Sequence, residues 1–427
     1  MDIELKKIKK IGGIIEVPAD KSITHRAIML SSLADGDSVI RNYLPSQDCL
    51  RTVEAFKQAG ACIKADGGNL YVKGAGLRLR RLRNEIYAGN SGTTARLMSG
   101  ILAGQNFESI ISGDESLSKR PMKRIMDPLT KMGAEIISEQ GMLPLKIKGT
   151  TPLKAVKYEN PLSSAQVKSA VLFAGLYADG ITSYSEPVKS RDHSERMLKA
   201  FGAKVETDGN AVRIYPAQKL EACDMSVPGD LSSAAFFIAA ALIVPDSELV
   251  IKNAGVNPSR SGFLEILQKM GARIEYENKR EVSGEPVCDI KVRHSKLKAV
   301  SIEAGIIPRM IDEIPVFALL AAQADGITKI TGARELRAKE SDRIEAVRSQ
   351  FEKLGIEIEA LEDGLIINGY PGYGIKGAVT DSFGDHRIAM TLAVASLISQ
   401  SAVTIRNAEC VNISFPGFYE RLESICR

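Results

Sequence analysis

Residues 20–40 read DKSITHRAIMLSSLADGDSVI, and the same design recurs five more times along the chain. Each copy has a polar or glycine-bearing start, an apolar helix rich in small residues, a short turn and a strand. The other copies begin near Gly89, Pro161, Pro228, Ile311 and Gly384. Recurrence of one pattern at a nearly constant period is typical of a fold built from structural repeats. We therefore interpret the chain as six related units.

A second kind of segment alternates with the first. It is an amphipathic helix that ends in glycine and leads into a strand, as in FKQAGACIKA at 56–65 and LQKMGARIEY at 267–276. Glycine at such a helix end adopts the left-handed conformation without strain. Five copies share this ending, with glycines at 60, 133, 202, 271 and 355. The amphipathic helices are expected on the outside of each domain and the apolar ones inside it.

The two ends of the chain complement each other in this pattern. The sixth amphipathic helix, at 415–427, has no strand behind it, while the chain starts with a strand that has no helix ahead of it. We expect these ends to complete one unit. The prediction is an α/β protein of two domains with six βαβαββ-like repeats, three per domain. Residues 1–19 plus 229–427 form the first, discontinuous domain, and residues 20–228 form the second.

Composition limits the possible functions. The 427 residues are 44% hydrophobic and 25% charged with a net charge of +4, which suits an ordinary globular enzyme and gives no general attraction to nucleic acid or membrane. The six cysteines form no CxxC pair, and the four histidines form no zinc motif. No apolar span of 18 residues or signal segment occurs. We expect a cytoplasmic protein that binds no metal.

Cations and hydroxyls gather at the starts of the repeated helices. The helix starts carry Lys21, Ser22, Arg26, Asn90, Gly92, Thr93, Arg96, Ser163, Ser164, Gln166, Lys168, Asp312, Glu313, Asp385, His386 and Arg387. Any one Ser, Thr, Asp or Asn there is more simply an N-cap. A Lys or Arg in the first turn, however, opposes the helix dipole, and a bound anion removes that conflict. The pattern predicts two anionic ligands, or one with separated anionic groups.

The usual phosphate-binding motifs are absent. The sequence has no GxxxxGK[ST] loop, no GxGxxG fingerprint and no aspartate cluster for Mg²⁺, which argues against a nucleotide-driven phosphoryl transferase. Acidic residues beside cations, at Asp312 and at the pair Lys339 and Glu340, indicate proton transfer on an anionic substrate instead. A structural ion pair remains the alternative for Lys339 and Glu340.

At these positions the chain resembles the enolpyruvyl transferases, in the branch whose acceptor is shikimate 3-phosphate. The resemblance covers essentially the full length. It is carried by nine motifs in the family's order: DKSITHRA, GNSGTTARL, SLSKRPM, SAQVKSA, SRDHSE, IDEIPV, KESDRI, DHRIAM and SFPGFYERL. It implies a two-domain inside-out α/β fold and transfer of the enolpyruvyl group of phosphoenolpyruvate to the 5-hydroxyl of shikimate 3-phosphate, by addition and elimination through a tetrahedral intermediate.

The resemblance also implies roles for individual residues. Asp312 would accept the proton of the attacking hydroxyl, and Glu340, with Lys21 nearby, would protonate the methylene carbon. The residues that would bind shikimate 3-phosphate are Lys21, Ser22, Arg26, Ser164, Gln166, Ser190, Arg191, Asp312 and Lys339. Those that would bind phosphoenolpyruvate are Lys21, Gly92, Arg120, Gln166, Arg343 and Arg387.

No metal or organic cofactor and no nucleic-acid partner is implied, and we expect a monomer. Because the candidates are split between both halves of the chain, the active site is expected in the cleft between the domains, which would close on the substrates.

Two other functions remain as alternatives. The first is the related transferase whose acceptor is UDP-N-acetylglucosamine. It typically has a reactive Cys in the segment that matches SLSKRPMKR and a Lys-Asn pair where this chain has Lys21 and Ser22. The second is a non-catalytic repeat scaffold that binds nucleic acid through the basic run RLRRLR at 78–83 and the cationic helix starts. Since no aromatics interleave with that run, it is better explained as a solvated strand edge.

One position departs from the family pattern. Many members carry a Lys just before the C-terminal FP, whereas this chain has Asn412, Ile413 and Ser414 before Phe415 and Pro416. That contact to phosphoenolpyruvate is therefore not expected here.

Overall fold

The computed structural model describes residues 1–372 and 374–427 and divides into two compact units. Unit 1 comprises Met1–Pro18, Pro228–Glu281 and Pro286–Arg427, and unit 2 comprises Ala19–Val227 with Val282–Glu285. The buried hydrophobic side chains form two clusters that follow the same division. Among the described residues no helix has both the length and the apolar character that a membrane crossing needs.

Unit 2 repeats one small sheet three times. In strand order the sheets are β14-β3-β5-β4, β6-β7-β9-β8 and β10-β11-β13-β12. Each begins with a parallel pair and continues with two antiparallel pairs. The strands are β3 (Asp37–Arg41), β4 (Cys62–Asp66), β5 (Asn69–Lys73), β6 (Ile86–Tyr87), β7 (Glu108–Ser112), β8 (Glu135–Ser138), β9 (Leu145–Lys148), β10 (Lys157–Glu159), β11 (Thr182–Ser185), β12 (Val205–Asp208), β13 (Ala211–Ile214) and β14 (Met225–Ser226).

Three buried helices form the centre of unit 2, namely α1 (Lys21–Leu33), α3 (Gly92–Ala103) and α6 (Ala165–Gly175). The backbones of α3 and α6 approach closely at Gly100, where a Cβ atom would lie 2.1 Å from the Ala170 carbonyl oxygen. More exposed helices lie outside them: α2 (Gln47–Gln58), α5 (Lys123–Lys131) and α7 (His193–Ala200), with the short α4 (Glu115–Ser118).

Unit 1 is built in the same way. Its sheets are β16-β17-β15-β2, β18-β20-β22-β21 with β19 paired to β20, and β1-β24-β23. Residues 1–18 thus add one strand to each of two sheets. The strands are β1 (Ile3–Leu5), β2 (Gly12–Glu16), β15 (Glu248–Gly255), β16 (Arg273–Val282), β17 (Glu285–Arg293), β18 (Leu297–Lys298), β19 (Ser301–Ile302), β20 (Ala324–Ile330), β21 (Ile358–Leu361), β22 (Gly364–Gly369), β23 (Val379–Asp381) and β24 (Val403–Arg406).

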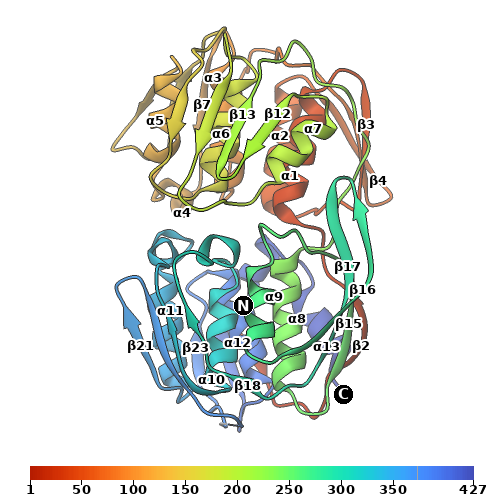
Figure 1. The fold of residues 1–427 in the computed structure, drawn as a ribbon, viewed down its shortest axis with the longest axis vertical. Helices are drawn as coiled ribbons and strands as arrows, with labels where there is room; N and C mark the ends of the chain where they lie inside the picture. Colours follow the sequence, from red (N-terminus) through yellow and green to blue (C-terminus); the bar gives the residue numbers. More distant parts are fainter. Residues whose placement is uncertain (373) are drawn as a thin grey trace. The chain divides into compact units, whose positions relative to one another are not determined.

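The buried helices of unit 1 are α8 (Leu231–Ile243), α10 (Ile314–Ala322) and α12 (His386–Ser396), which pack side by side (Figure 1). All residues of α8 are buried, as its apolar sequence LSSAAFFIAAALI predicts. Around them lie α9 (Gly262–Lys269), α11 (Arg343–Lys353), α13 (Phe418–Ile425) and the 3₁₀ helices η1 (Ile307–Arg309), η2 (Arg334–Ala338) and η3 (Ala408–Ile413). Six alternations of a buried and an outer helix confirm the predicted α/β fold class.

Among the described residues, polar side chains cap five of the six buried helices. Asp20, Ser91, Ser164, Asp230 and Asp385 each accept a hydrogen bond from a backbone N–H in the first turn. Such caps satisfy backbone donors that have no partner within the helix. The N-cap explanation therefore holds for these residues, whereas the cations that follow them need another one.

Candidate active site

In unit 2 the first candidate residue, Lys21, begins α1. The Asp20 carboxylate caps this helix by accepting from the Ile23 N–H at 2.9 Å. Lys21 Nζ lies 3.2 Å from Asp48 Oδ2, and both side chains are largely buried. Removing two charges from water costs free energy, and this cost is compensated only when the charges are paired or bind a ligand. Asp48 thus holds the ammonium group at the helix start, where an anion would also be stabilised.

Arg26 is buried one turn further along α1. Its Nε donates to Ser194 Oγ at 2.7 Å, its Nη2 donates to Ser169 Oγ at 2.7 Å, and its Nη1 donates to the Ser22 carbonyl at 2.9 Å. Burial lowers the pKa of Arg26 to about 10, which leaves the guanidinium protonated at neutral pH. The two serines belong to α6 and α7, so three helices fix the orientation of this cation.

His25 lies between Lys21 and Arg26 in sequence and faces the core. It is fully buried, and its Nδ1 lies 2.7 Å from Thr52 Oγ1. Burial, together with the charges of Lys21 and Arg26, holds the pKa of His25 well below its ordinary value. This histidine is therefore neutral and has a structural role.

Two arginines lie beside the start of α3. A methyl group on Gly92 would lie 3.4 Å from Arg96 Nη1 and 3.8 Å from Arg120 Nη1, so both guanidinium groups reach this glycine. Arg120 Nη2 donates to Asn90 Oδ1 at 2.7 Å. A side chain at position 92 would occupy the space next to these cations, which glycine leaves open for a ligand.

Gln166 and Ser164 come from the start of α6. Gln166 Oε1 accepts from Arg96 at 2.5 Å, and its amide nitrogen donates to Thr93 Oγ1 at 3.2 Å. The Ser164 N–H donates to Glu186 Oε2 at 3.1 Å. The predicted residues of the second and third repeats are thus joined by hydrogen bonds within unit 2.

Ser190 occupies a different kind of environment. Its hydroxyl and its backbone N–H both donate to Glu186 Oε1 at 2.7 Å. Glu186 and Glu195 in turn pair with the fully buried Lys168, at 3.1 and 2.8 Å. Because the single hydroxyl proton of Ser190 is already donated, Arg191, which is partly exposed beside it, is the better candidate for a phosphate ligand.

In unit 1 the candidate residues meet at Arg343. This arginine, with a side chain only 1% exposed, makes four hydrogen bonds to three carboxylates: Asp385 at 2.8 and 3.3 Å, Glu340 at 2.7 Å and Asp312 at 3.3 Å. Burial by itself would lower the pKa of Arg343, but the three carboxylates raise it above its ordinary value. The predicted base and acid, Asp312 and Glu340, are therefore both within contact of one guanidinium group.

Two further arginines flank Asp312. Arg387 Nη1 donates to the Asp312 carbonyl at 3.1 Å, and its Nη2 lies 3.7 Å from Asp312 Oδ2. On another side, Arg260 Nη1 lies 3.9 Å from Asp312 Oδ2. Arg260 is itself held by Asp230 at 2.9 Å and Glu313 at 3.5 Å. Three arginines, Arg343, Arg387 and Arg260, thus lie within 4 Å of the Asp312 carboxylate.

Lys339 and Glu340 lie in the segment between η2 and α11, and both are partly exposed. Glu340 is directed to Arg343 as described above. Glu340 takes part in an ion pair with Arg343 at 2.7 Å.

Sequence reasoning missed several residues of these two clusters. The sequence does not single out Arg260, Ser169 or Ser194, and it indicates Asp385 only as the start of a helix. Arg260 shows a related signal, since it is a cation that immediately precedes the N-cap residue of α9. Ser169 and Ser194 carry no signal in the sequence, because only the packing of helices brings them to Arg26.

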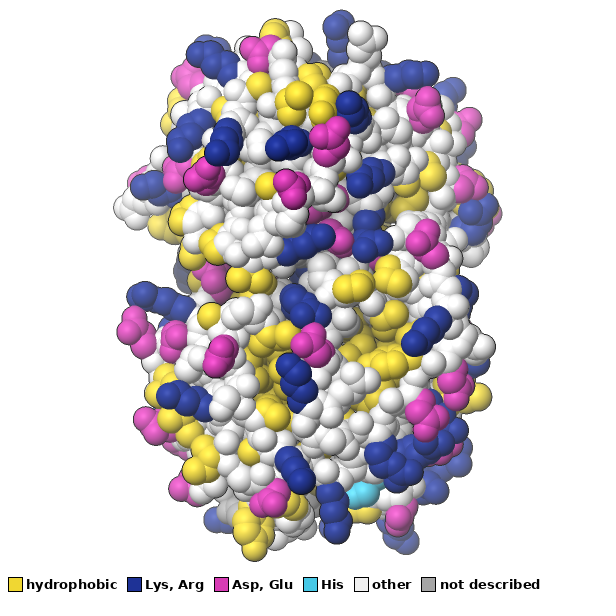
Figure 2. All heavy atoms as spheres, in the orientation of Figure 1, with side chains coloured by type: hydrophobic (Ala, Val, Ile, Leu, Met, Phe, Trp, Pro, Cys, Tyr) yellow, Lys and Arg dark blue, Asp and Glu magenta, His cyan; other side chains and the backbone are white. Residues whose placement is uncertain are grey.

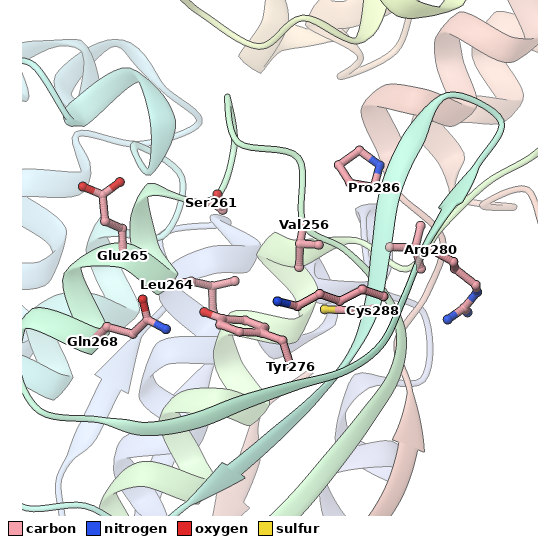
Figure 3. A pocket seen from close by; sticks show the side chains of 11 residues that line it. Val256, Ser261, Leu264, Glu265, Gln268, Tyr276, Arg280, Pro286 and Cys288 are labelled. Carbon is pink, nitrogen blue, oxygen red and sulfur yellow. The ribbon is translucent and has the colours of Figure 1, made fainter.

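Unit 1 contains a pocket of about 290 Å³ (Figure 3). It is bounded by α9 and by the hairpin of β16 and β17, and its lining includes Val256, Leu264, Tyr276 and Cys288. On the face shown in Figure 2, hydrophobic side chains gather around a hollow over these elements, while Lys, Arg, Asp and Glu are interspersed elsewhere. None of the residues predicted to bind substrate lines this pocket.

Comparison with known proteins identifies the family of the chain. The family model of EPSP synthase (3-phosphoshikimate 1-carboxyvinyltransferase) matches residues 5–422. A 3-phosphoshikimate 1-carboxyvinyltransferase of Endomicrobium trichonymphae is 65% identical, with full coverage of both chains, and one of Geobacillus kaustophilus is 49% identical over 98% of each. The solved structure of EPSP synthase from Acinetobacter baumannii superposes with a TM-score of 0.89 at 42% identity, covering 100% of this chain and 98% of that one. The chain therefore belongs to the EPSP synthase family of 3-phosphoshikimate 1-carboxyvinyltransferases.

Proposed function

We propose that the chain transfers the enolpyruvyl group of phosphoenolpyruvate to the 5-hydroxyl of shikimate 3-phosphate and releases phosphate. This is the reaction of its family, in the shikimate pathway of aromatic amino acid biosynthesis. The observation that carries the proposal is the pair of carboxylates on Arg343, at 3.3 Å from Asp312 and 2.7 Å from Glu340. An addition across a carbon–carbon double bond needs a base and an acid close together, and these two come from separate segments.

In the addition step, Asp312 takes the proton of the 5-hydroxyl while its oxygen attacks C2 of phosphoenolpyruvate. Glu340, assisted by Lys21, gives a proton to the methylene carbon, which becomes a methyl group. The tetrahedral intermediate then loses a proton from that methyl group as the bond from C2 to the phosphate oxygen breaks. Phosphate leaves, and the enol ether remains. Neither step needs an oxidant or a metal for its atoms and electrons to balance.

Binding of phosphoenolpyruvate is assigned to Arg120, Arg343 and Arg387, with Lys21, Gly92 and Gln166. An arginine fork matches a carboxylate or phosphate with two parallel hydrogen bonds. Arg343 has five N–H donors and makes four hydrogen bonds to carboxylates, so a two-bond contact with phosphoenolpyruvate requires at least one of these bonds to be given up.

Binding of shikimate 3-phosphate is assigned mainly to unit 2, through Lys21, Ser22, Arg26, Ser164, Gln166 and Ser190 or Arg191, with Asp312 and Lys339 from unit 1. Support comes from the way Arg26 and Gln166 are fixed by hydrogen bonds to other candidate segments. Side chains that are already oriented lose less entropy on binding. The proposal requires both clusters to act on the same pair of substrates.

The direct test is release of inorganic phosphate from phosphoenolpyruvate by the purified chain. We expect release only when shikimate 3-phosphate is also present, and none with UDP-N-acetylglucosamine as the acceptor. Release that depends on UDP-N-acetylglucosamine would favour the related transferase instead. An absence of turnover with either acceptor, combined with salt-dependent binding of DNA or RNA, would favour the scaffold alternative.

We further propose that the chain acts as a monomer in the cytoplasm and without a nucleic-acid partner. Each catalytic role above is filled by one chain, which is what a monomer requires. Sedimentation velocity at enzymatic concentrations tests this, and a dimer that loses activity on dilution would contradict it.

A further inference from the structure

The turn of the β16–β17 hairpin is held in unit 2, although both strands run in unit 1. Three contacts fix this turn. His193 Nδ1 lies 2.8 Å from Glu285 Oε1, Arg196 Nη1 donates to the Gly284 carbonyl at 2.9 Å, and the Ser226 N–H donates to Ser283 Oγ at 2.8 Å. The repeat pattern of the sequence does not indicate that Val282–Glu285 pack with unit 2.

Glu285 and His193 form a buried pair. Each side chain is only 2% exposed, and His193 Nε2 is buried without a hydrogen-bond partner among the described residues. The hydrogen bond to Glu285 is thus the polar contact that orients the imidazole ring. A buried carboxylate is costly compared with an apolar side chain of similar size, so packing alone does not explain a glutamate at this place.

His193 of this pair is adjacent in sequence to Ser194, which accepts a hydrogen bond from Arg26. His193 is the first residue of α7 and Ser194 is the second. Ser194 Oγ accepts from Arg26 Nε at 2.7 Å and also lies 2.7 Å from Ser169 Oγ. Burial lowers the pKa of Arg26, and the charge of Glu285 is among those that oppose this effect. Glu285 is therefore linked to Arg26 mainly through the first turn of α7, since its charge is the weakest of those that oppose the effect of burial on this guanidinium.

We propose that Glu285 is a positioning residue for the binding of shikimate 3-phosphate. It orients His193 and so holds the start of α7 in the place where Ser194 fixes the Arg26 guanidinium. The inference rests on the proposed function, in which Arg26 binds this substrate. Because β16 and β17 continue from the turn into unit 1, a segment from the second half of the chain thereby orients a ligand-binding side chain in unit 2.

The test is calorimetric titration of shikimate 3-phosphate into variants of the whole chain. For Glu285→Ala we expect the dissociation constant to rise roughly tenfold, by analogy with the 10–100-fold losses seen when a residue that orients a metal ligand is changed. Glu285→Gln keeps an oxygen that accepts from His193 and should bind within about twofold of the unchanged chain. Glu281→Gln, an exposed change on the same hairpin, is the matched control and should have no effect.

Steady-state kinetics separates positioning from general damage. Glu285→Ala should raise KM for shikimate 3-phosphate while KM for phosphoenolpyruvate and kcat at saturation stay nearly constant. A variant that had merely lost part of its folded population would instead lose kcat, with both KM values unchanged. If Glu285→Ala does not fold, His193→Ala removes the same contact from the other side.

Arg26→Lys separates a failure of the role proposed for Glu285 from a failure of the assignment of Arg26 to shikimate 3-phosphate. If this variant binds shikimate 3-phosphate weakly while Glu285→Ala and His193→Ala bind it normally, the role of Glu285 is wrong and the proposed function stands. If Arg26→Lys itself binds normally, the assignment of Arg26 to this substrate fails, and the role of Glu285 fails with it.

Discussion

Arg343 is the single residue on which the candidate chemistry of unit 1 depends most. Its guanidinium group joins Asp312 and Glu340, which come from segments 28 positions apart, to the buried Asp385. The motifs IDEIPV and KESDRI indicated the first two carboxylates. Neither motif indicates that one arginine holds both, because this depends on how α10, α11 and α12 pack.

The first prediction concerns the two carboxylates. Asp312→Asn and Glu340→Gln preserve the shape of each side chain but remove its ability to exchange a proton. We expect each change to lower kcat by roughly 10²- to 10⁴-fold, the usual contribution of general acid–base catalysis, with little change in substrate binding. Glu359→Gln, an exposed change on β21, is the control. Turnover at the unchanged rate in either variant would remove that residue from the mechanism.

The second prediction is a pH dependence of stability. Burial by itself would raise the pKa of Asp385, but the charge of Arg343 lowers it below the ordinary value. A carboxyl with a lowered folded pKa stabilises the fold above its unfolded pKa, and this stability is lost as pH falls through the folded pKa. The destabilisation caused by Asp385→Asn should therefore stay constant from pH 7 to about pH 5 and shrink below about pH 4.

Urea unfolding of both proteins at a series of pH values measures this difference. A difference in unfolding free energy that remains unchanged at pH 3 would show that Asp385 is not held ionised by Arg343.

At the scale of the elements, the sequence predicted the alternation of buried and outer helices because each leaves a strong local pattern. The glycines that end the outer helices are the clearest case. Gly271 has a φ of +88° and Gly355 one of +80°, both in the left-handed region that other residues avoid. The turn of the β16–β17 hairpin was not predicted, since its contacts with α7 join residues 88 and 92 positions apart and follow no local pattern.

The third prediction concerns the glycines at the C-terminal ends of the outer helices. At Gly271 a Cβ atom would meet only the Lys296 carbonyl oxygen, at 3.8 Å, so Gly271→Ala adds backbone strain without a clash. We expect a loss of about 1–2 kcal/mol in unfolding free energy, the cost of a left-handed conformation for an ordinary residue. Gly271→Asn should lose less, because asparagine tolerates this conformation. Equal melting temperatures for all three proteins would show that Gly271 is not required at this helix end.

At the scale of the whole molecule, each unit gathers its own cluster of candidate residues. In unit 2 the cluster centres on Lys21, Arg26 and Gln166, and in unit 1 on Arg343. Family motifs in the sequence were sufficient to select most of these residues. They did not reveal the supporting contacts, such as those from Ser169 and Ser194, because serines occur throughout the chain.

The fourth prediction concerns the domain closure expected from the sequence. If both clusters act on the same substrates, addition of shikimate 3-phosphate should make the molecule more compact. Small-angle scattering with and without the substrate measures the radius of gyration, which should fall on addition. An unchanged radius at saturating substrate would count against closure.

We expect cations of both units to bind the same small acid. The decisive measurement is KM for phosphoenolpyruvate at saturating shikimate 3-phosphate, in Arg120→Gln of unit 2 and in Arg387→Gln of unit 1. The exposed change Arg81→Gln is the control. Both KM values should rise at least about tenfold, since each change removes a charge-assisted hydrogen bond that contributes roughly 1.5–3 kcal/mol. An unchanged KM for phosphoenolpyruvate in either of the two variants would show that the cations of the two units do not bind the same acid.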